Sequence, residues 1–321
     1  MKLRLAVATA VELLAVCFAQ AQTKLTISAT ASLASAPMFI AEDRGYFRNE
    51  GFSVDFKWFD AAQPVAVAVA AGEAQFGITG LSAALYNMAT AQTIRIIAGG
   101  AREAPGYSTG AYFVSNEAFA RGIHAPKDVR GKSFGLTTVG SPYQYSLALL
   151  AEKYGFALSE VQQVPLQTFT NVLVAIKGQR VDAGILNSFV ALPAAQRGEG
   201  KIIGWVGDET PWQLSAVLTS TAMLERQGES VQKFLRAYRE GARAFHDAFM
   251  VAETAETKQQ KDALLPILEK YSKLERAQVL TSLNFVPRDG GIYVADISRQ
   301  IRSEEHTSEL QSRFGISYAV F

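Results

Sequence analysis

Small polar residues come directly after expected strands at four places in this chain. The four segments are Ser32–Ala36, Thr79–Ser82, Gly140–Tyr143 and Asn187–Ser188. Ligands of open α/β sheets bind just beyond the carboxyl ends of the strands. Ser141, Ser188 and Gly80 are expected at helix N-termini, where free backbone N–H groups and the helix dipole bind an anion without a salt bridge. These segments therefore predict a site for a small polar or anionic ligand.

A competing interpretation gives these residues a purely structural role. Serine, threonine and asparagine are common N-caps, and Pro142 suits the first position of a helix that Ser141 would cap. The same loops carry almost no Lys or Arg, so a singly charged or neutral ligand fits them better than a phosphate. Tyr107 and Tyr143 flank glycine and proline turns and are the preferred aromatic residues for lining a cleft.

Motifs for other chemistry are incomplete. Gly131-Lys132-Ser133 ends like a phosphate-binding loop, but Pro126 stands where that loop needs a glycine. Of the three histidines, His124 is expected in a loop and His246 in a helix among phenylalanines. Each fits a surface or packing role better than catalysis. No G-x-G-x-x-G or G-x-S-x-G motif occurs.

Composition narrows the class of protein further. Cys17 is the only cysteine, and it lies in the N-terminal segment. The rest of the chain therefore offers no disulfide, no cysteine-ligated zinc, no iron–sulfur cluster and no cysteine nucleophile. The formal net charge is +1, which gives no field for nucleic acid. We expect no metal, no cofactor and no enzymatic activity.

The first 21 residues have the layout of a secretory signal peptide. Lys2 and Arg4 precede an apolar run over 5–18, and Ala19-Gln20-Ala21 is a small-x-small cleavage site. Glu12 is unusual inside such a run. Lipid anchoring at Cys17 is the alternative, but Val16 stands where a lipoprotein signal needs a small residue. The sequence predicts cleavage after Ala21 and a periplasmic location.

The last 20 residues resemble the translation of a DNA adapter. Residues 302–312 are what a widely used sequencing-library adapter encodes, and 316–321 resemble the translation of its continuation in the same frame. The alternative is a genuine polar tail. We interpret 302–321 as non-native and without function, so that the natural C-terminus is replaced.

Strands and helices alternate through the rest of the chain, which predicts an α/β class with mainly parallel sheets. Expected elements include a strand over 25–29, a helix over 36–48 and a strand over 53–58. Two similar sequence segments, 71–78 and 177–185, each predict a helix end, a glycine turn and a buried strand. This internal similarity and the length suggest two lobes. We place lobe one at 24–112 plus 215–301 and lobe two at 113–214, with a two-crossing hinge between them.

The stretch Ala41-Glu-Asp-Arg-Gly-Tyr-Phe-Arg-Asn-Glu-Gly-Phe-Ser-Val-Asp-Phe56 resembles a signature of periplasmic solute-binding proteins of the nitrate, sulfonate and taurine type. The resemblance extends over about 24–301, and relatives that bind thiamine-pyrimidine precursors are included. It implies a type II-like periplasmic-binding-protein fold with two lobes. It also implies capture of a small solute by hinge closure, as a monomer that delivers its solute to an ABC permease and its ATPase.

Carrying the resemblance over residue by residue places the solute among residues from both lobes. The complete set of candidate ligand-binding residues is Ser32, Ser35, Thr79, Gly80, Ser82, Tyr107, Ser141, Tyr143, Asn187 and Ser188. The solute itself stays open among sulfonates, taurine, nitrate, aromatic carboxylates and pyrimidine-like compounds.

Two other functions are compatible with the same fold. One is an enzyme of pyrimidine-precursor synthesis, but the cysteine-rich, iron-dependent chemistry that this resemblance implies lacks its cysteines here. The other is a periplasmic ligand-sensing module that signals to a membrane partner. Neighbouring permease and ATPase genes would favour transport, and a neighbouring sensor kinase would favour signalling.

Overall fold

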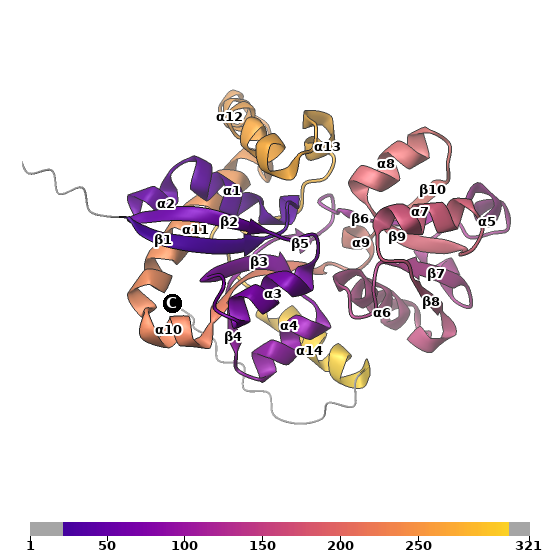
Figure 1. The fold of residues 1–321 in the computed structure, drawn as a ribbon. Helices are drawn as coiled ribbons and strands as arrows, with labels where there is room; N and C mark the ends of the chain where they lie inside the picture. The colour runs from indigo at the N-terminus through magenta and orange to yellow at the C-terminus, as the bar shows by residue number, and fades with distance from the viewer. Residues whose placement is uncertain (1–21, 308–321) are drawn as a thin grey trace, which may run out of the picture.

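The computed structural model describes residues 22–307, with side chains as far as Arg302. Two five-stranded sheets lie beside each other, each flanked by helices, as Figure 1 shows. The mixed α/β class predicted from the sequence is confirmed. The predicted signal peptide, Cys17 and the segment 308–321 lie outside the described residues. Within 22–307, no helix is long and apolar enough to cross a membrane.

The first sheet has the strand order β2-β1-β3-β12-β4. Its strands are β1 (Thr23–Ala29), β2 (Phe52–Trp58), β3 (Phe76–Gly80), β4 (Ile94–Gly99) and β12 (Ser215–Ser220). Only β12 runs against the other four. The central strand β3 is buried from Phe76 to Thr79, as expected for a strand covered on both faces.

The second sheet has the order β10-β6-β9-β7-β8. Its strands are β6 (Gly110–Val114), β7 (Ser133–Leu136), β8 (Gln162–Pro165), β9 (Ala183–Asn187) and β10 (Lys201–Trp205). Here only β6 runs against the other four. Read from β8 to β10, the order repeats that of the first sheet, with β7 matching β1 and β9 matching β3.

The two similar sequence segments, 71–78 and 177–185, correspond to a repeated unit in this topology. Helix α3 (Ala62–Ala70) leads into β3, and helix α7 (Phe169–Lys177) leads into β9. Both strands lie at the centre of their sheets. The similarity therefore marks equivalent units, and the loops that follow β3 and β9 occupy equivalent positions.

Helices cover both faces of each sheet (Figure 1). One core of the first sheet packs against α1 (Ala36–Asp43), α11 (Gly228–Phe249) and α12 (Ala255–Ser272). Phe76 of β3 stacks on Phe234 of α11 with ring centroids 3.6 Å apart. The other core of that sheet lies under α3 and α4 (Ala83–Thr90). In the second sheet, α6 (Pro142–Tyr154) contributes to one core, and α7 with α8 (Ser188–Gln196) contributes to the other.

The helix expected over 36–48 is broken in two. Gly45 separates α1 from α2 (Tyr46–Asn49) with a φ of +74°, a left-handed conformation that glycine adopts without steric cost. Phe47 still reaches the core and stacks on Phe234. The remaining short helices are α5 (Asn116–Ala120), α9 (Val206–Glu209), α10 (Thr221–Arg226) and α13 (Arg276–Leu280), with 3-10 turns η1 (Leu33–Ser35), η2 (Pro126–Val129) and η3 (Leu158–Glu160).

The chain passes between the sheets through a short antiparallel ladder. Strand β5 (Arg102–Glu103) pairs with β11 (Trp212–Gln213). All of β6 belongs to the second sheet, so a boundary at Tyr112 would fall inside a strand. If the two sheets are taken as the two lobes, as we propose, the first crossing lies within residues 100–109.

A C-terminal helix, α14 (Val294–Thr307), bridges the two sheets. It packs against α4 of the first sheet, α6 of the second and β11 of the ladder. The Tyr145 hydroxyl donates to Asp296 Oδ1 over 3.3 Å, and Arg299 pairs with Glu152 at 2.7 Å. Residues 302–307, which we interpret as non-native, continue the backbone of this helix.

Candidate functional site

The predicted strand-end residues follow equivalent strands of the two sheets. Ser32 and Ser35 come after β1, and Thr79 to Ser82 lie at the end of β3. Ser141 and Tyr143 come after β7, and Asn187 and Ser188 lie at the end of β9. Because matching strands feed these loops, the fold places them as two sets, one on each sheet.

On the first sheet, the hydroxyl groups are used by the chain itself. Exposed Ser32 caps η1 by accepting from the backbone N–H of Ala34 at 3.2 Å. Ser35 donates to the carbonyl of Thr30 at 3.2 Å, and Thr79 donates to the carbonyl of Ala62 at 3.3 Å. Ser82, not Gly80, is the N-cap of α4, and Gly80 is the last residue of β3. In this conformation, each of these hydroxyl groups therefore has a hydrogen-bond partner within the protein and stabilises the local backbone.

On the second sheet, two of the side chains keep a hydrogen-bond donor available. Ser141 caps α6 as expected, accepting from the N–H of Gln144 at 3.3 Å, and Pro142 follows at the first helical position. Ser188 is buried and donates to the Ser282 hydroxyl at 2.8 Å. Half-buried Asn187 precedes α8 without capping it, and its amide nitrogen donates to no residue within the described range. The Asn187 amide therefore has a donor to spare, and so do the hydroxyl groups of Ser32 and Ser141, which among the described residues only accept hydrogen bonds.

The two sets of loops meet. Gly80 lies so near the second sheet that a Cβ on it would be 3.0 Å from Pro142 Cγ. The N–H of Ala83, in the first turn of α4, donates to the carbonyl of Gly140 at 3.3 Å. A backbone carbonyl of the second sheet's loop thus occupies a position at this helix N-terminus where an anion could bind.

Tyr143 belongs to a buried polar cluster around Glu103, a residue that the sequence did not single out. Glu103 Oε1 accepts from the Tyr143 hydroxyl at 3.2 Å and from the Thr109 hydroxyl at 2.8 Å. Its carboxylate also accepts from Ser108 Oγ at 2.5 Å and from the N–H groups of Thr109 and Gly110. Asn284 donates to the Thr109 hydroxyl at 3.1 Å.

Burial dominates the protonation of this cluster. Glu103 has no exposed surface, and this burial raises its pKa although five donors surround the carboxylate. Burial also raises the pKa of the Tyr143 hydroxyl well above its ordinary value, and the neighbouring Glu103 adds to the effect. Thr109 N–H and Tyr143 thereby hold the ladder against α6, which makes the cluster a fixed point of the connection between the sheets.

Tyr107 lies elsewhere. Its ring packs edge-on against Phe285, with centroids 6.1 Å apart, and its backbone closes a turn with Ala104. The structure therefore brings Tyr143, but not Tyr107, into a hydrogen-bonded cluster with the ladder.

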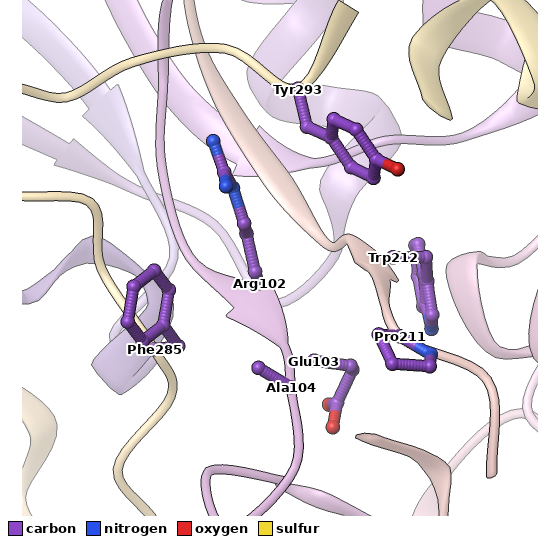
Figure 2. Close-up of a pocket in the computed structure, with 7 residues that line it drawn as sticks. All are labelled: Arg102, Glu103, Ala104, Pro211, Trp212, Phe285 and Tyr293. Atoms are coloured by element: carbon purple, nitrogen blue, oxygen red, sulfur yellow. The ribbon is translucent and has the colours of Figure 1, made fainter. Parts of the chain in front are cut away.

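A cavity of about 170 Å³ borders the ladder. Its lining is drawn in Figure 2 and consists of Arg102, Glu103, Ala104, Pro211, Trp212, Phe285 and Tyr293. Residues 285–293 form one side of it, because Arg102 N–H bonds the carbonyl of Phe285 and Arg102 Nη2 bonds the carbonyl of Gly291. None of the strand-end residues lines this cavity, so it is separate from the predicted site.

Among the described side chains, 22–302, no three His, Cys, Asp or Glu residues gather closely enough to hold a metal ion.

Solved structures with the same fold are numerous. The ligand-binding component of an ABC-type import system from Staphylococcus aureus is 13% identical, with a TM-score of 0.71 over 92% of this chain and 94% of that one. The periplasmic aliphatic sulphonate-binding protein SsuA from Escherichia coli is 18% identical, with a TM-score of 0.68 over 91% and 90%. The nitrate-binding protein NrtA from Synechocystis is 12% identical, with a TM-score of 0.61 over 81% and 69%.

These likenesses establish the periplasmic-binding-protein fold that the resemblance implied. No curated protein sequence matches this chain. The family model described as NMT1/THI5 like matches residues 32–248, which include every strand of the two sheets except β1, the β5–β11 ladder and most of α11. The chain belongs to the NMT1/THI5-like family.

Proposed function

We propose that this protein is the extracytoplasmic solute-binding component of an ABC importer. The observation that carries the proposal is the meeting of two equivalent sets of strand-end loops across a narrow hinge ladder. A solute held between the loops would contact both sheets, and such contacts favour a closed over an open arrangement. The named binding functions of the structural neighbours support the same role.

The solute we propose is small and either singly anionic or neutral. Sulfonates, taurine, nitrate and pyrimidine-like compounds fit this description. The supporting observation is the donor set: hydroxyls of Ser32 and Ser141, the Asn187 amide and helix N-termini, without a lysine or arginine among the strand-end candidates. Hydrogen-bond donors of this kind orient one acidic group, whereas a phosphate calls for cationic partners.

In the proposed cycle, the protein carries out no chemical reaction. The solute enters while the loops are apart, the sheets close on it by rotation about the ladder, and a permease with its ATPase accepts the closed form. We propose a periplasmic monomer, exported by residues 1–21 and released by cleavage after Ala21. We likewise propose that lobe one comprises the first sheet with 215–301, and that 302–321 contribute nothing to function.

A thermal-shift screen tests the proposal. The chain from Gln22 onward would be heated with taurine, ethanesulfonate, nitrate, benzoate and a hydroxymethylpyrimidine. A bound solute stabilises the folded state by mass action, by about 2.7 kcal/mol at a hundred times its dissociation constant. We expect one chemical class to raise the melting temperature by several degrees.

Substitution of Asn187 distinguishes binding in the cleft, by which we mean the space between the two sets of strand-end loops, from binding elsewhere. Asn187→Ala removes the spare amide donor, and we expect it to weaken binding about ten-fold, the usual cost of one hydrogen bond to a charged group. Asn87→Ala, on the exposed surface of α4, is the matched control and should bind normally. If no solute raises the melting temperature and one of them is chemically converted, the protein is an enzyme and not a transport component.

A further inference from the structure

The cavity that borders the β5–β11 ladder is lined by other residues than the strand-end loops. Its deep end is formed by Trp212, which is 1% exposed, and by the buried stem of Glu103. Its outer end is formed by Tyr293, which is 47% exposed, and by Pro211. The cavity thus runs from the surface inward to the two-stranded ladder.

We propose that this cavity is a second binding site, which takes a small aromatic monocarboxylate with its ring against Trp212 and Phe285 and its carboxylate on Arg102. The proposal concerns a site apart from the cleft and does not depend on which solute the cleft takes.

Arg102 supplies the charge. The guanidinium donates from Nε to Gln213 Oε1 at 3.1 Å and from Nη2 to the Gly291 carbonyl at 3.0 Å. It lies 5.5 Å from the centre of the Tyr293 ring. Both hydrogen-bond acceptors are neutral. Asp289 and Asp296 act on the guanidinium electrostatically, but within 22–302 no carboxylate lies within ion-pair distance of it. A half-buried arginine whose remaining N–H groups are free is suited to a carboxylate, which it binds with two parallel hydrogen bonds.

The lone acidic group of the lining does not oppose an anion. Figure 2 shows the Glu103 carboxylate directed away from the Arg102 guanidinium. Both of its oxygens accept hydrogen bonds on the far side, from Ser108, Thr109, Gly110 and Tyr143. Only the uncharged stem of Glu103 is left to face the cavity.

Size and lining favour a single ring. An apolar cavity of about 150 Å³ in another protein holds benzene, and the cavity here is slightly larger, at about 170 Å³. Trp212, Phe285, Pro211 and Ala104 provide apolar surface on several sides. Trp212 Nε1 is buried without a hydrogen-bond partner, so this part of the molecule also has an unused donor.

The experiment is a nuclear magnetic resonance titration with benzoate. Trp58, Trp205 and Trp212 give the three indole N–H signals of the chain, and Trp212→Phe identifies the one that belongs to the cavity. We expect benzoate to shift the Trp212 signal saturably in the chain from Gln22 onward. Benzyl alcohol, which has the ring without the carboxylate, should bind about ten-fold or more weakly.

Three variants locate the binding. Ala104→Leu fills the cavity and keeps the Arg102 charge, and it should abolish the shift. Arg102→Gln should weaken binding at least about ten-fold. Arg180→Gln removes an exposed charge in the turn between α7 and β9, and Asn187→Ala alters the strand-end loops of the second sheet. Both should leave the Trp212 shift intact. An unmoved Trp212 signal at high benzoate, or an equal shift in the folded Ala104→Leu variant, would overturn the proposal, and neither result bears on solute binding in the cleft.

Discussion

Individual side chains in this protein divide into those that hold the backbone and those that remain available. Ser141 stands at the helix N-terminus that its spacing predicted, whereas Ser82 caps α4 in place of the expected Gly80; each serine accepts a backbone N–H there. Asn187 has a spare donor, whereas Ser188 is fully buried and bonded. The sequence predicts the Ser141 cap because a serine directly ahead of a proline carries a local signal for a helix start.

Glu103 could not be predicted in the same way. A single carboxylate in a turn-rich segment forms no recognisable sequence motif. Its hydrogen-bond donors Ser108, Thr109 and Gly110 reach it only because the loop folds back on it. Tyr143 arrives from a different sheet. The cluster forms only when the tertiary structure brings its residues together, so no local sequence pattern predicts it.

The protonation of Glu103 leads to a prediction about pH and stability. Because burial raises its pKa above the ordinary value of 4.5, the folded chain binds this proton more tightly than the unfolded chain does. The resulting stabilisation is fully present below about pH 4.5 and is lost as the pH rises through the raised folded pKa. The loss amounts to about 1.4 kcal/mol for each pH unit by which the pKa is raised.

Glu103→Gln has no proton to lose at this position. We expect the unfolding free energy of the wild type to fall relative to that of the variant between pH 4.5 and 8. Urea unfolding of both proteins across this range measures the difference, and Glu117→Gln, an exposed carboxylate, serves as the control. Parallel curves for the wild type and Glu103→Gln would contradict the assignment.

Among the elements, the strands were easier to predict than the connections. Buried β3 and β9 follow from their apolar runs and the glycine turns before them. The reversal of β6 and β12 was not predictable, because each is the strand by which the chain enters a sheet from the ladder. The break at Gly45 was missed because the apolar spacing of the segment continues through it, while the left-handed φ belongs to a single residue.

Helix α14 gives a prediction about the segment that we interpret as non-native. Among its side chains that the structure describes, which extend as far as Arg302, the buried ones are Asp296, Ile297, Gln300 and Ile301. Asp296 accepts from the backbone N–H of Gln213 at 2.8 Å and from Gln300 Nε2 at 2.7 Å. We propose that these contacts are sufficient to anchor the helix.

A chain ending at Ile301 should keep its stability. We expect the unfolding free energy to change by less than about 0.5 kcal/mol, the usual range for surface changes. Asp296→Ala, which leaves Gln213 and Gln300 without their acceptor, should cost about 2–3 kcal/mol or more in the same assay. If truncation after Ile301 proves as costly as Asp296→Ala, residues 302–321 are part of the fold.

At the scale of the whole molecule, two sheets of equal topology are connected by a narrow ladder and touch at their loops. The two similar sequence segments and the family signature were enough to predict two lobes of mainly parallel strands. The contact between Ala83 and Gly140 was not predictable, because it depends on how the sheets are oriented about the ladder.

Locking that contact tests whether the sheets must separate for a solute to enter. A Cβ on Gly140 would lie 3.2 Å from Ala83 Cβ, so the pair Ala83→Cys and Gly140→Cys needs a shift of only a few tenths of an ångström to form a disulfide. The left-handed φ of +73° at Gly140 adds a strain of about 1–2 kcal/mol. The chain from Gln22 onward has no competing thiol.

We expect the oxidised double variant to bind the solute at least about ten-fold more slowly, with the rate restored by dithiothreitol, because entry would require the loops to part. Each single-cysteine variant is a control for the substitutions themselves. Stopped-flow measurement of tryptophan fluorescence gives the rate. Equal rates in the oxidised and reduced forms would show that entry does not require this opening.

Isothermal titration calorimetry of the chain from Gln22 onward, with the panel of sulfonates, nitrate, carboxylates and pyrimidines, tests the central claim most directly. Reversible binding of one solute class in the cleft is predicted to give a stoichiometry of one for that site, weakened by Asn187→Ala, with the solute recovered unchanged. Heat from none of them, or recovery of a chemically altered solute, would contradict the account.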